Sequence, residues 1–209
     1  VPAGLKIMLD EWYNIQKTRN TPWFRVSGSR KNPPGWVMRE HTDLICTADA
    51  WENPENPSEL WLVSAGHDCT VKLWNPDTGE VKQNLSHENT VRHVIFLHDG
   101  RIISGDDDGI ICLWDPREPT ENTHVVVKLD EGEAVTSLIV FFKKGIIAGG
   151  NKGTIVYWDS NKDTCKKKLK HHEEEISCMK VFSENSVISG SSDSQIKIWN
   201  PTNEESETI

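Results

Sequence analysis

Short runs in which apolar and polar residues alternate recur along most of this chain, separated by Gly, Asp, Asn and Ser. Alternation with a period of two predicts β-strands with one buried face, and two such runs joined by a short polar turn predict a hairpin. Four predicted hairpins fall into one register, each with a tryptophan near its end: LWLVSAGHDCTVKLWN, RIISGDDDGIICLWD, GIIAGGNKGTIVYWD and SVISGSSDSQIKIWN. The chain is therefore expected to repeat one β-unit.

Further strands are predicted on both sides of these hairpins. One alternating run precedes each hairpin: DLICTADA, TVRHVIFLH, AVTSLIVFF and EISCMKVF. A polar run follows the first three: EVKQNL, THVVVKL and TCKKKLK. Each unit thus predicts a four-stranded antiparallel sheet with a solvated outer strand, and the predicted fold class is all-β. No convincing outer strand follows Trp199.

Residues 1–40 stand apart from the repeats. The apolar side chains within residues 3–18 lie near one helical stripe, which predicts a short N-terminal helix: Leu5, Met8, Leu9, Trp12 and Ile15. GWVMREH, residues 35–41, stands where the outer strand of a preceding unit would lie. The segment is interpreted as a helix and linker, and the first residue, Val1 rather than Met, suggests a piece of a longer protein.

The repeat is marked by tryptophans at intervals of 40, 44 and 41 residues: Trp74, Trp114, Trp158 and Trp199. An Asp or Asn follows each of them, and in three units a histidine stands 27 to 33 residues before. This pattern resembles the WD-repeat β-propeller family over about residues 41–209. The resemblance implies propeller blades over about residues 41–86, 87–130, 131–170 and 171–209. Because most members close with seven blades, it also implies part of a larger propeller.

The resemblance further implies a buried network in each blade, formed by a loop histidine, a serine on the second strand, an aspartate in the hairpin turn and the tryptophan. Matched by position, three blades carry complete sets: His41, Ser64, Asp68 and Trp74; His87, Ser104, Asp108 and Trp114; His172, Ser189, Asp193 and Trp199. Within the run DDDG, Asp108 is thus the expected structural residue, and Asp106 and Asp107 are its exposed neighbours. The third blade has Glu131, Ala148 and Lys152 at these positions, which leaves packing or a Glu131–Lys152 pair to hold it.

Catalytic and metal-binding interpretations of the same residues are weaker. Ser, His and Asp form the triad of acyl-transfer enzymes, but a set that recurs at a fixed period favours a structural use. DDDG lacks the later glutamate of an EF-hand loop, and His171-His172 has no cysteine at zinc-finger spacing. GGNKGT lacks the spacing of a phosphate loop. The sequence therefore predicts no catalytic residue, no cofactor and no metal site, and the protein is not expected to be an enzyme.

Composition narrows the class of partner. A formal net charge of -9 argues against a nucleic-acid scaffold, and the longest apolar run, VTSLIVFF, is far too short to cross a membrane. Five cysteines without a CxxC pair favour a reducing compartment. The expected location is cytoplasmic, with the nucleus as the alternative, and the expected partners are other proteins or peptides.

The resemblance implies a non-catalytic scaffold that docks peptides or domains on one face of the propeller. The family's contact positions flank the first strand's first aliphatic residue and precede the turn aspartate. Carried over to this chain, they give a mixed set: His67, Arg92, Asp107, Thr136, Asn151, Glu175 and Ser177.

Two other functions stay open. WDPR, residues 114–117, matches the WDxR box of substrate receptors in cullin-type ubiquitin ligases, with Arg117 as the adaptor contact. The repeats are also compatible with a regulatory or targeting domain of a longer enzyme, such as a kinase or a GTPase regulator.

Overall fold

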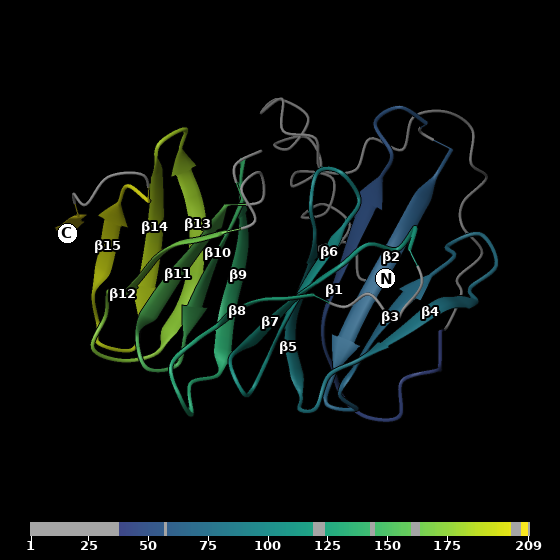
Figure 1. Cartoon of the computed structure of the whole chain (residues 1–209), viewed down its shortest axis with the longest axis horizontal. Helices are drawn as coiled ribbons and strands as arrows, with labels where there is room; N and C mark the ends of the chain where they lie inside the picture. Colours follow the sequence, from purple (N-terminus) through teal and green to yellow (C-terminus); the bar gives the residue numbers. More distant parts are fainter. Residues whose placement is uncertain are drawn as a thin grey trace, which may run out of the picture. The chain divides into compact units, whose positions relative to one another are not determined.

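A computed structural model describes residues 38–209 except residues 57, 119–123, 143–144, 160–163, 202–205 and 209. The predicted N-terminal helix lies outside these residues, as does the first half of GWVMREH. Residues 38–41, its second half, form no strand. The described residues are strands, turns and loops without an α-helix, so the predicted all-β fold class is confirmed (Figure 1).

The strands form four antiparallel four-stranded sheets in chain order, here named blades 1 to 4. Blade 1 contains β1 (Ile45–Glu52), β2 (Leu60–Gly66), β3 (Thr70–Trp74) and β4 (Val81–Ser86). Blade 2 contains β5 (Val91–Phe96), β6 (Ile102–Asp106), β7 (Ile110–Trp114) and β8 (His124–Lys128). Blade 3 contains β9 (Val135–Phe141), β10 (Gly145–Gly150), β11 (Thr154–Asp159) and β12 (Thr164–Lys170). Blade 4 contains β13 (Ile176–Ser183), β14 (Ser186–Ser191), β15 (Ile196–Trp199) and β16 (Ser206–Thr208).

Blade 4 corrects one expectation. The sequence predicted no outer strand after Trp199, but β16 pairs with β15, with Trp199 opposite Ser206 and Lys197 opposite Thr208. The strand is three polar residues long, so it has no alternation for a pattern to detect. Backbone hydrogen bonding to the edge of β15 defines it instead.

The blades pack face to face, with the first strands β1, β5, β9 and β13 side by side. Each of the three contacts between neighbouring blades has its own apolar cluster. Ile102 of blade 2 lies in the cluster shared with blade 1, and Ile103 lies in the cluster shared with blade 3. Because successive residues of a strand point to opposite faces, the fully buried pair Ile102 and Ile103 ties blade 2 to both neighbours.

The outer face of blade 4 repeats the apolar pattern of a face that blade 3 buries. Ile155 stands three residues before Trp158 and is 1% exposed, whereas Ile196 stands three residues before Trp199 and is 50% exposed. Phe182 follows Ile176 at the distance at which the buried Phe141 follows Val135, and it is 63% exposed. Blade 4 therefore presents the composition of a blade-to-blade contact with no described residue packed on it.

Candidate functional site

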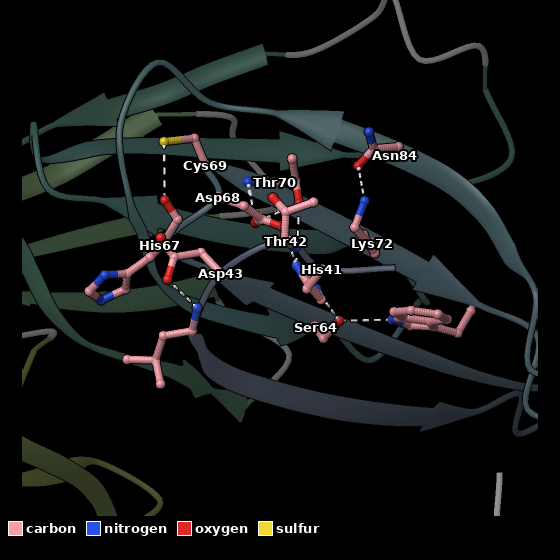
Figure 2. Close-up of polar contacts among 12 residues, drawn as sticks. His41, Thr42, Asp43, Ser64, His67, Asp68, Cys69, Thr70, Lys72 and Asn84 are labelled. Atoms are coloured by element: carbon pink, nitrogen blue, oxygen red, sulfur yellow. Dashed lines mark hydrogen bonds and ion pairs between the residues drawn. The ribbon is translucent and has the colours of Figure 1, made fainter. Parts of the chain in front are cut away.

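His41 lies between a serine and an aspartate at one end of blade 1 (Figure 2). Its Nδ1 is 2.8 Å from Asp68 Oδ2, and its Nε2 is 2.7 Å from Ser64 Oγ. The indole Nε1 of Trp74 donates to the same serine oxygen at 2.8 Å. One chain of hydrogen bonds thus joins the loop before β1, strands β2 and β3 and the turn between them.

A neutral histidine satisfies every group in this chain. The Trp74 indole only donates and the Asp68 carboxylate only accepts. His41 therefore donates from Nδ1 to Asp68, and the Ser64 hydroxyl donates to Nε2 while accepting from the indole. The arrangement fixes the histidine tautomer and holds the loop before β1 against the hairpin turn.

Asp68 anchors the turn through further hydrogen bonds. Its Oδ1 accepts from the Thr70 amide at 3.2 Å and from Thr70 Oγ1 at 2.8 Å, and its Oδ2 accepts from the Thr42 amide at 3.1 Å. Burial raises the pKa of the Asp68 carboxyl, but hydrogen bonds from Thr70, Thr42 and His41 outweigh burial and lower that pKa to about 2. The carboxylate is therefore ionised whenever the blade is folded near neutral pH.

Blade 2 contains the same chain of hydrogen bonds with a different aspartate. Trp114 Nε1 donates to Ser104 Oγ at 2.7 Å, and His87 Nε2 lies 2.6 Å from that oxygen. His87 Nδ1 is 2.8 Å from Oδ2 of Asp106, which is fully buried. The prediction of Asp108 as the network residue is corrected: Asp108 is exposed, and its amide donates to Asp106 Oδ1 at 3.0 Å.

The backbone position of the carboxylate explains this exchange. Asp106 is the last residue of β6 and pairs with Val91, as Gly66 at the end of β2 pairs with Ile45. A carboxylate that starts from the strand end reaches the site that Asp68 reaches from the turn. Asp106 Oδ1 also accepts from the Ile110 amide at 2.8 Å, the counterpart of the bond between Thr70 N and Asp68.

In blade 3 the carboxylate that accepts from the turn amides comes from a third backbone position, the loop before the first strand. Glu133, in the loop before β9, is fully buried, and its Oε1 accepts from the Lys152 and Thr154 amides, each at 3.1 Å. These amides correspond to those of Asp108 and Ile110 in blade 2. Sequence spacing did not indicate Glu133. Of the expected Glu131–Lys152 pair, the structure contains a bond from Lys152 Nζ to the backbone carbonyl of Glu131 at 2.9 Å.

Blades 3 and 4 lack part of the tryptophan contact. Ala148 replaces the serine in blade 3, and the buried Trp158 Nε1 has no hydrogen-bond partner among the described residues. In blade 4, His172 lies 2.9 Å from both Ser189 Oγ and Asp193 Oδ2, but Trp199 Nε1 likewise has no partner in the described part of the chain. Only blades 1 and 2 therefore contain the chain from indole to carboxylate, judged on those residues.

The linkage of Ser to His Nε2 and of His Nδ1 to Asp has the connectivity of a hydrolase triad. The serines are 7% exposed in blade 1, fully buried in blade 2 and 1% exposed in blade 4, so a substrate carbonyl does not reach them. In blades 1 and 2 the serine oxygen also accepts from an indole. The arrangement therefore fits a structural role. In the ranges that the structure describes, no three His, Cys, Asp or Glu side chains gather as metal ligands, and no helix is long and apolar enough to span a bilayer.

The four hairpin turns share one backbone arrangement. One turn amide donates to the carbonyl that precedes the first strand of its blade: His67 to Leu44 at 2.8 Å, Asp107 to Thr90 at 3.0 Å, Asn151 to Ala134 at 3.1 Å, and Ser192 to Glu175 at 2.9 Å. Each turn is therefore clamped beside the start of the first strand. The predicted contact residues of all four blades consequently lie at the same end of the sheets, here named the turn end.

Arg92 and Asp107 form an ion pair on the turn end of blade 2. Arg92 Nε lies 2.5 Å from Asp107 Oδ1 and Nη2 lies 3.2 Å from Oδ2, and the side chains are 47% and 24% exposed. The hydrogen bond to Asp107 raises the pKa of the Arg92 guanidinium, and the charges of Asp107 and of Glu175 add to this effect. Glu175 of blade 4 is therefore within electrostatic reach of Arg92 in blade 2.

The other predicted contact residues differ in how free their side chains are. Thr136 is half-buried, and its Oγ1 donates to the Ile176 carbonyl at 2.8 Å, which links blades 3 and 4. Asn151 is exposed, but its Oδ1 accepts from the Ala134 amide at 3.0 Å. The remaining three are exposed: His67, Glu175 and Ser177.

Arg117 lies at the opposite end of blade 2. It is 61% exposed and forms a two-bonded ion pair with Asp115, in which Nε and Nη2 each donate at 2.7 Å. That hydrogen bonding lowers the pKa of the Asp115 carboxyl. The ion pair holds the guanidinium against its own loop, and an adaptor contact by Arg117 stays a prediction.

Comparison with known proteins identifies sequence relatives of the repeats. The family described as "WD40: WD domain, G-beta repeat" matches residues 34–75, 79–115 and 163–200. Residues 116–162, between the second and third matches, contain β9, β10 and β11 of blade 3, the blade without the histidine and serine. U3 small nucleolar RNA-associated protein 15 of Schizosaccharomyces pombe is 34% identical over 143 residues, covering 66% of this chain and 28% of that protein.

A second relative and a solved structure agree with this match. The ribosome biogenesis protein WDR12 homolog of Trichoplax adhaerens is 23% identical over 172 residues, covering 79% of this chain and 38% of that protein. This chain therefore spans 28% and 38% of the two relatives. The WD40 β-propeller domain of Doa1 superimposes with a TM-score of 0.63 at 25% identity, covering 78% of this chain and 53% of that one.

Proposed function

Because this chain belongs to the WD40 family of β-propeller proteins, we propose that it is a non-catalytic scaffold that binds another protein through the turn end of its blades. The names of its relatives place them in assemblies with small nucleolar RNA and in ribosome biogenesis. A role within a multi-protein assembly is the activity proposed for this chain as well.

One observation carries the proposal. The same position of each first strand, directly after its first aliphatic residue, lies at the turn end: Cys46, Arg92, Thr136 and Ser177. Because the first strands pack side by side, these four side chains belong to one continuous surface. The Arg92–Asp107 pair gives that surface a cation and an anion in fixed positions, and fixed charges favour specificity and fast association over affinity alone.

Exchanging the charges of Arg92 and Asp107 tests whether the two side chains contact a partner or only pair with each other. The variant Arg92→Asp/Asp107→Arg keeps an ion pair but exchanges the charges presented to a partner. Proteins captured by the unchanged chain should be lost from the swap variant, while the thermal midpoint stays unchanged. Glu184→Lys, which reverses an exposed charge in the loop between β13 and β14 at the end of blade 4 opposite the turn end, is the control and should keep the same partners. Identical capture by all three chains would contradict the proposal.

Ribonuclease treatment of the same captures tests the class of partner. The net charge of -9 favours contact with protein rather than RNA, so the captured proteins should stay bound after treatment. The name of one relative refers to small nucleolar RNA, which supports the nuclear alternative for location. The cytoplasmic location, the ligase-adaptor contact and the role as a domain of a longer enzyme stay predictions.

A further inference from the structure

A pocket of about 300 Å³ opens between blades 1 and 2, at the end of the sheets opposite the turn end. Strand pairing places it there, because Glu52 pairs with Leu60 at the far end of the β1–β2 ladder from Ile45 and Gly66. Its lining comes from the loop after β1, the loop after β5 and the loop after β7. This cavity, here named the loop pocket, is lined by aromatic and charged side chains that include Trp51, Glu55, Glu59, Trp61, Asp99 and Arg117.

Two indoles form the apolar part of the loop pocket. Trp51 and Trp61 are directly opposite each other in the β1–β2 ladder and so project from the same face. Trp51 Nε1 donates to the His98 carbonyl at 3.2 Å, and Trp61 Nε1 donates to Glu59 Oε1 at 2.9 Å. Both rings also pack on the apolar cluster between blades 1 and 2. The pocket therefore has aromatic walls that are held in place before any ligand arrives.

The indole of Trp61 already lies next to a cation. Lys82 Nζ is 4.8 Å from the centroid of this ring, within the range in which ammonium and guanidinium groups are attracted to aromatic faces.

The charge of the loop pocket is unbalanced. Its arginine, Arg117, is paired with Asp115, and Asp99 is paired with Arg101 at 2.8 Å. The Glu59 carboxylate accepts only from neutral donors, the Trp61 indole and the side-chain Nδ2 of Asn53 at 2.7 Å. The exposed Glu55 carboxylate has no partner within the described ranges. Two carboxylates at the pocket are thus left without a cation.

We propose that the loop pocket binds the guanidinium group of an arginine side chain from a partner protein. A guanidinium is planar and weakly hydrated, stacks on indoles and bonds carboxylates through two parallel N–H groups. Aromatic walls beside two carboxylates that have no cationic partner among the described residues present the groups that such a cation requires. The loop pocket lies at the opposite end of the blades from the turn end, so binding at either site stands if binding at the other fails.

Binding is measured on the full chain with N-acetyl-arginine amide as the probe. The indole Nε1–H signals of Trp51 and Trp61 in proton–nitrogen NMR spectra report on the pocket walls directly. Both signals should shift and saturate with the arginine probe, and they should stay in place with N-acetyl-citrulline amide, which has a similar shape and no charge.

Charge variants test the contribution of the carboxylates. Glu55→Lys places a cation at the pocket and should weaken binding of the probe by about fivefold or more, the effect of reversing one partly exposed charge. Glu184→Lys is the matched control, because Glu184 is an exposed carboxylate at the same end of blade 4, and it should leave binding unchanged. Both positions are exposed, so neither change disturbs the fold.

Three results would overturn the proposal. Equal shifts with the citrulline probe would show that charge plays no part. If Glu55→Lys and Glu184→Lys weaken binding of the arginine probe equally, the net charge of the chain and not the pocket explains the effect. Tighter binding of N-acetyl-trimethyllysine amide than of the arginine probe would assign the pocket to an ammonium group instead.

Discussion

The carboxylate of Glu133 lies directly over Gly150, in the space that a side chain at position 150 would need. Gly150 corresponds to Asp106 of blade 2, since both end the second strand of their blade and pair with the valine that starts the first strand. In blade 2 the turn amides donate to an aspartate at the end of the second strand. In blade 3 they donate to a glutamate from the loop before the first strand, and a glycine stands at the aspartate position.

This relationship predicts strong coupling between two substitutions. Glu133→Ala should destabilise the chain by about 1–3 kcal/mol, because it removes the acceptor of the Lys152 amide and of the buried Thr154 amide. Gly150→Asp alone should also destabilise it, because the new side chain overlaps Glu133. The double variant recreates the arrangement of Asp106 and should be more stable than either single one. Urea titrations of all four proteins give the coupling energy, and additive losses would contradict the arrangement.

Because Asp106 rather than Asp108 bonds His87, substitutions at these two positions should differ in their effect on stability. Asp106→Ala should lower the free energy of unfolding by about 1–3 kcal/mol, because His87 and two turn amides lose a buried acceptor. Asp108→Ala should change it by less than about 0.5 kcal/mol, as is usual for exposed sites. Thermal melts distinguish the two, and equal losses would return the network role to Asp108.

The lowered pKa of Asp68 predicts loss of stability in acid. The group's ordinary value is 3.8 and its folded value is about 2, so the folded state binds fewer protons than the unfolded state between these values. The stabilisation is complete above about pH 4 and declines as the pH falls toward 2. Hydrogen bonds from His172 and from two amides outweigh burial and lower the pKa of the Asp193 carboxyl in the same direction.

The thermal midpoint of the unchanged chain should therefore fall across this window. Asp68→Asn should lower the midpoint at pH 7 and flatten its decline in acid. A variant whose acid profile runs parallel to that of the unchanged chain would exclude Asp68 as a source of the dependence.

The turns predict two stabilising substitutions. The residue after the aspartate position has positive φ in all four turns: Cys69 (60°), Gly109 (72°), Gly153 (85°) and Ser194 (67°). Left-handed backbone costs a non-glycine residue about 1–2 kcal/mol, so Ser194→Gly and Cys69→Gly should raise the free energy of unfolding by about 1 kcal/mol. Gly109→Ala is the reverse control and should destabilise, because its Cβ would also overlap the Glu133 carbonyl. Denaturant midpoints that move the same way in all three would refute this.

The open face of blade 4 predicts self-association. Ile196 and Phe182 expose apolar surface of the kind that blade 3 buries, and such patches promote contacts between molecules. The isolated chain should therefore associate in a concentration-dependent manner, and Ile196→Lys should reduce this association without lowering the thermal midpoint. Sedimentation velocity measures the effect. A chain that is monomeric at high concentration with Ile196 intact would contradict the prediction.

The strands apart from β16, and the blade order, were predictable because they follow from alternation and from the period of the tryptophans. The carboxylates were only partly predictable. The turn requires an acceptor at one point in space, and Asp68, Asp106 and Glu133 reach that point from three backbone positions. Counting residues back from the tryptophan finds only the first. The sequence does contain one signal for Glu133: a glycine, Gly150, stands where blade 2 has Asp106, and a glutamate stands in the loop before β9. This signal can be interpreted only once the structure shows that the Asp106 side chain fills the corresponding space in blade 2.

The loop pocket was not predictable from spacing, because its walls come from loops of two different blades. The proline-bearing segment at residues 52–59 is recognisable in the sequence as an insertion. The register of β1 and β2 places Trp51 opposite Trp61. This register also determines that the segment brings Glu55 and Glu59 beside the two indoles, which the sequence alone does not show.

The four tryptophans differ in the hydrogen bonding of their indole N–H groups. Hydrogen exchange of each indole N–H therefore reports on local opening in its own blade. The indole N–H groups of Trp74 and Trp114 are bonded and buried, whereas those of Trp158 and Trp199 are buried without a partner among the described residues. Neighbouring blades share apolar clusters, but each indole N–H reports on opening around its own tryptophan. Deuterium therefore enters the third and fourth blades through packing fluctuations alone. In the first two blades, exchange also requires the indole to lose its hydrogen bond to Ser64 or Ser104.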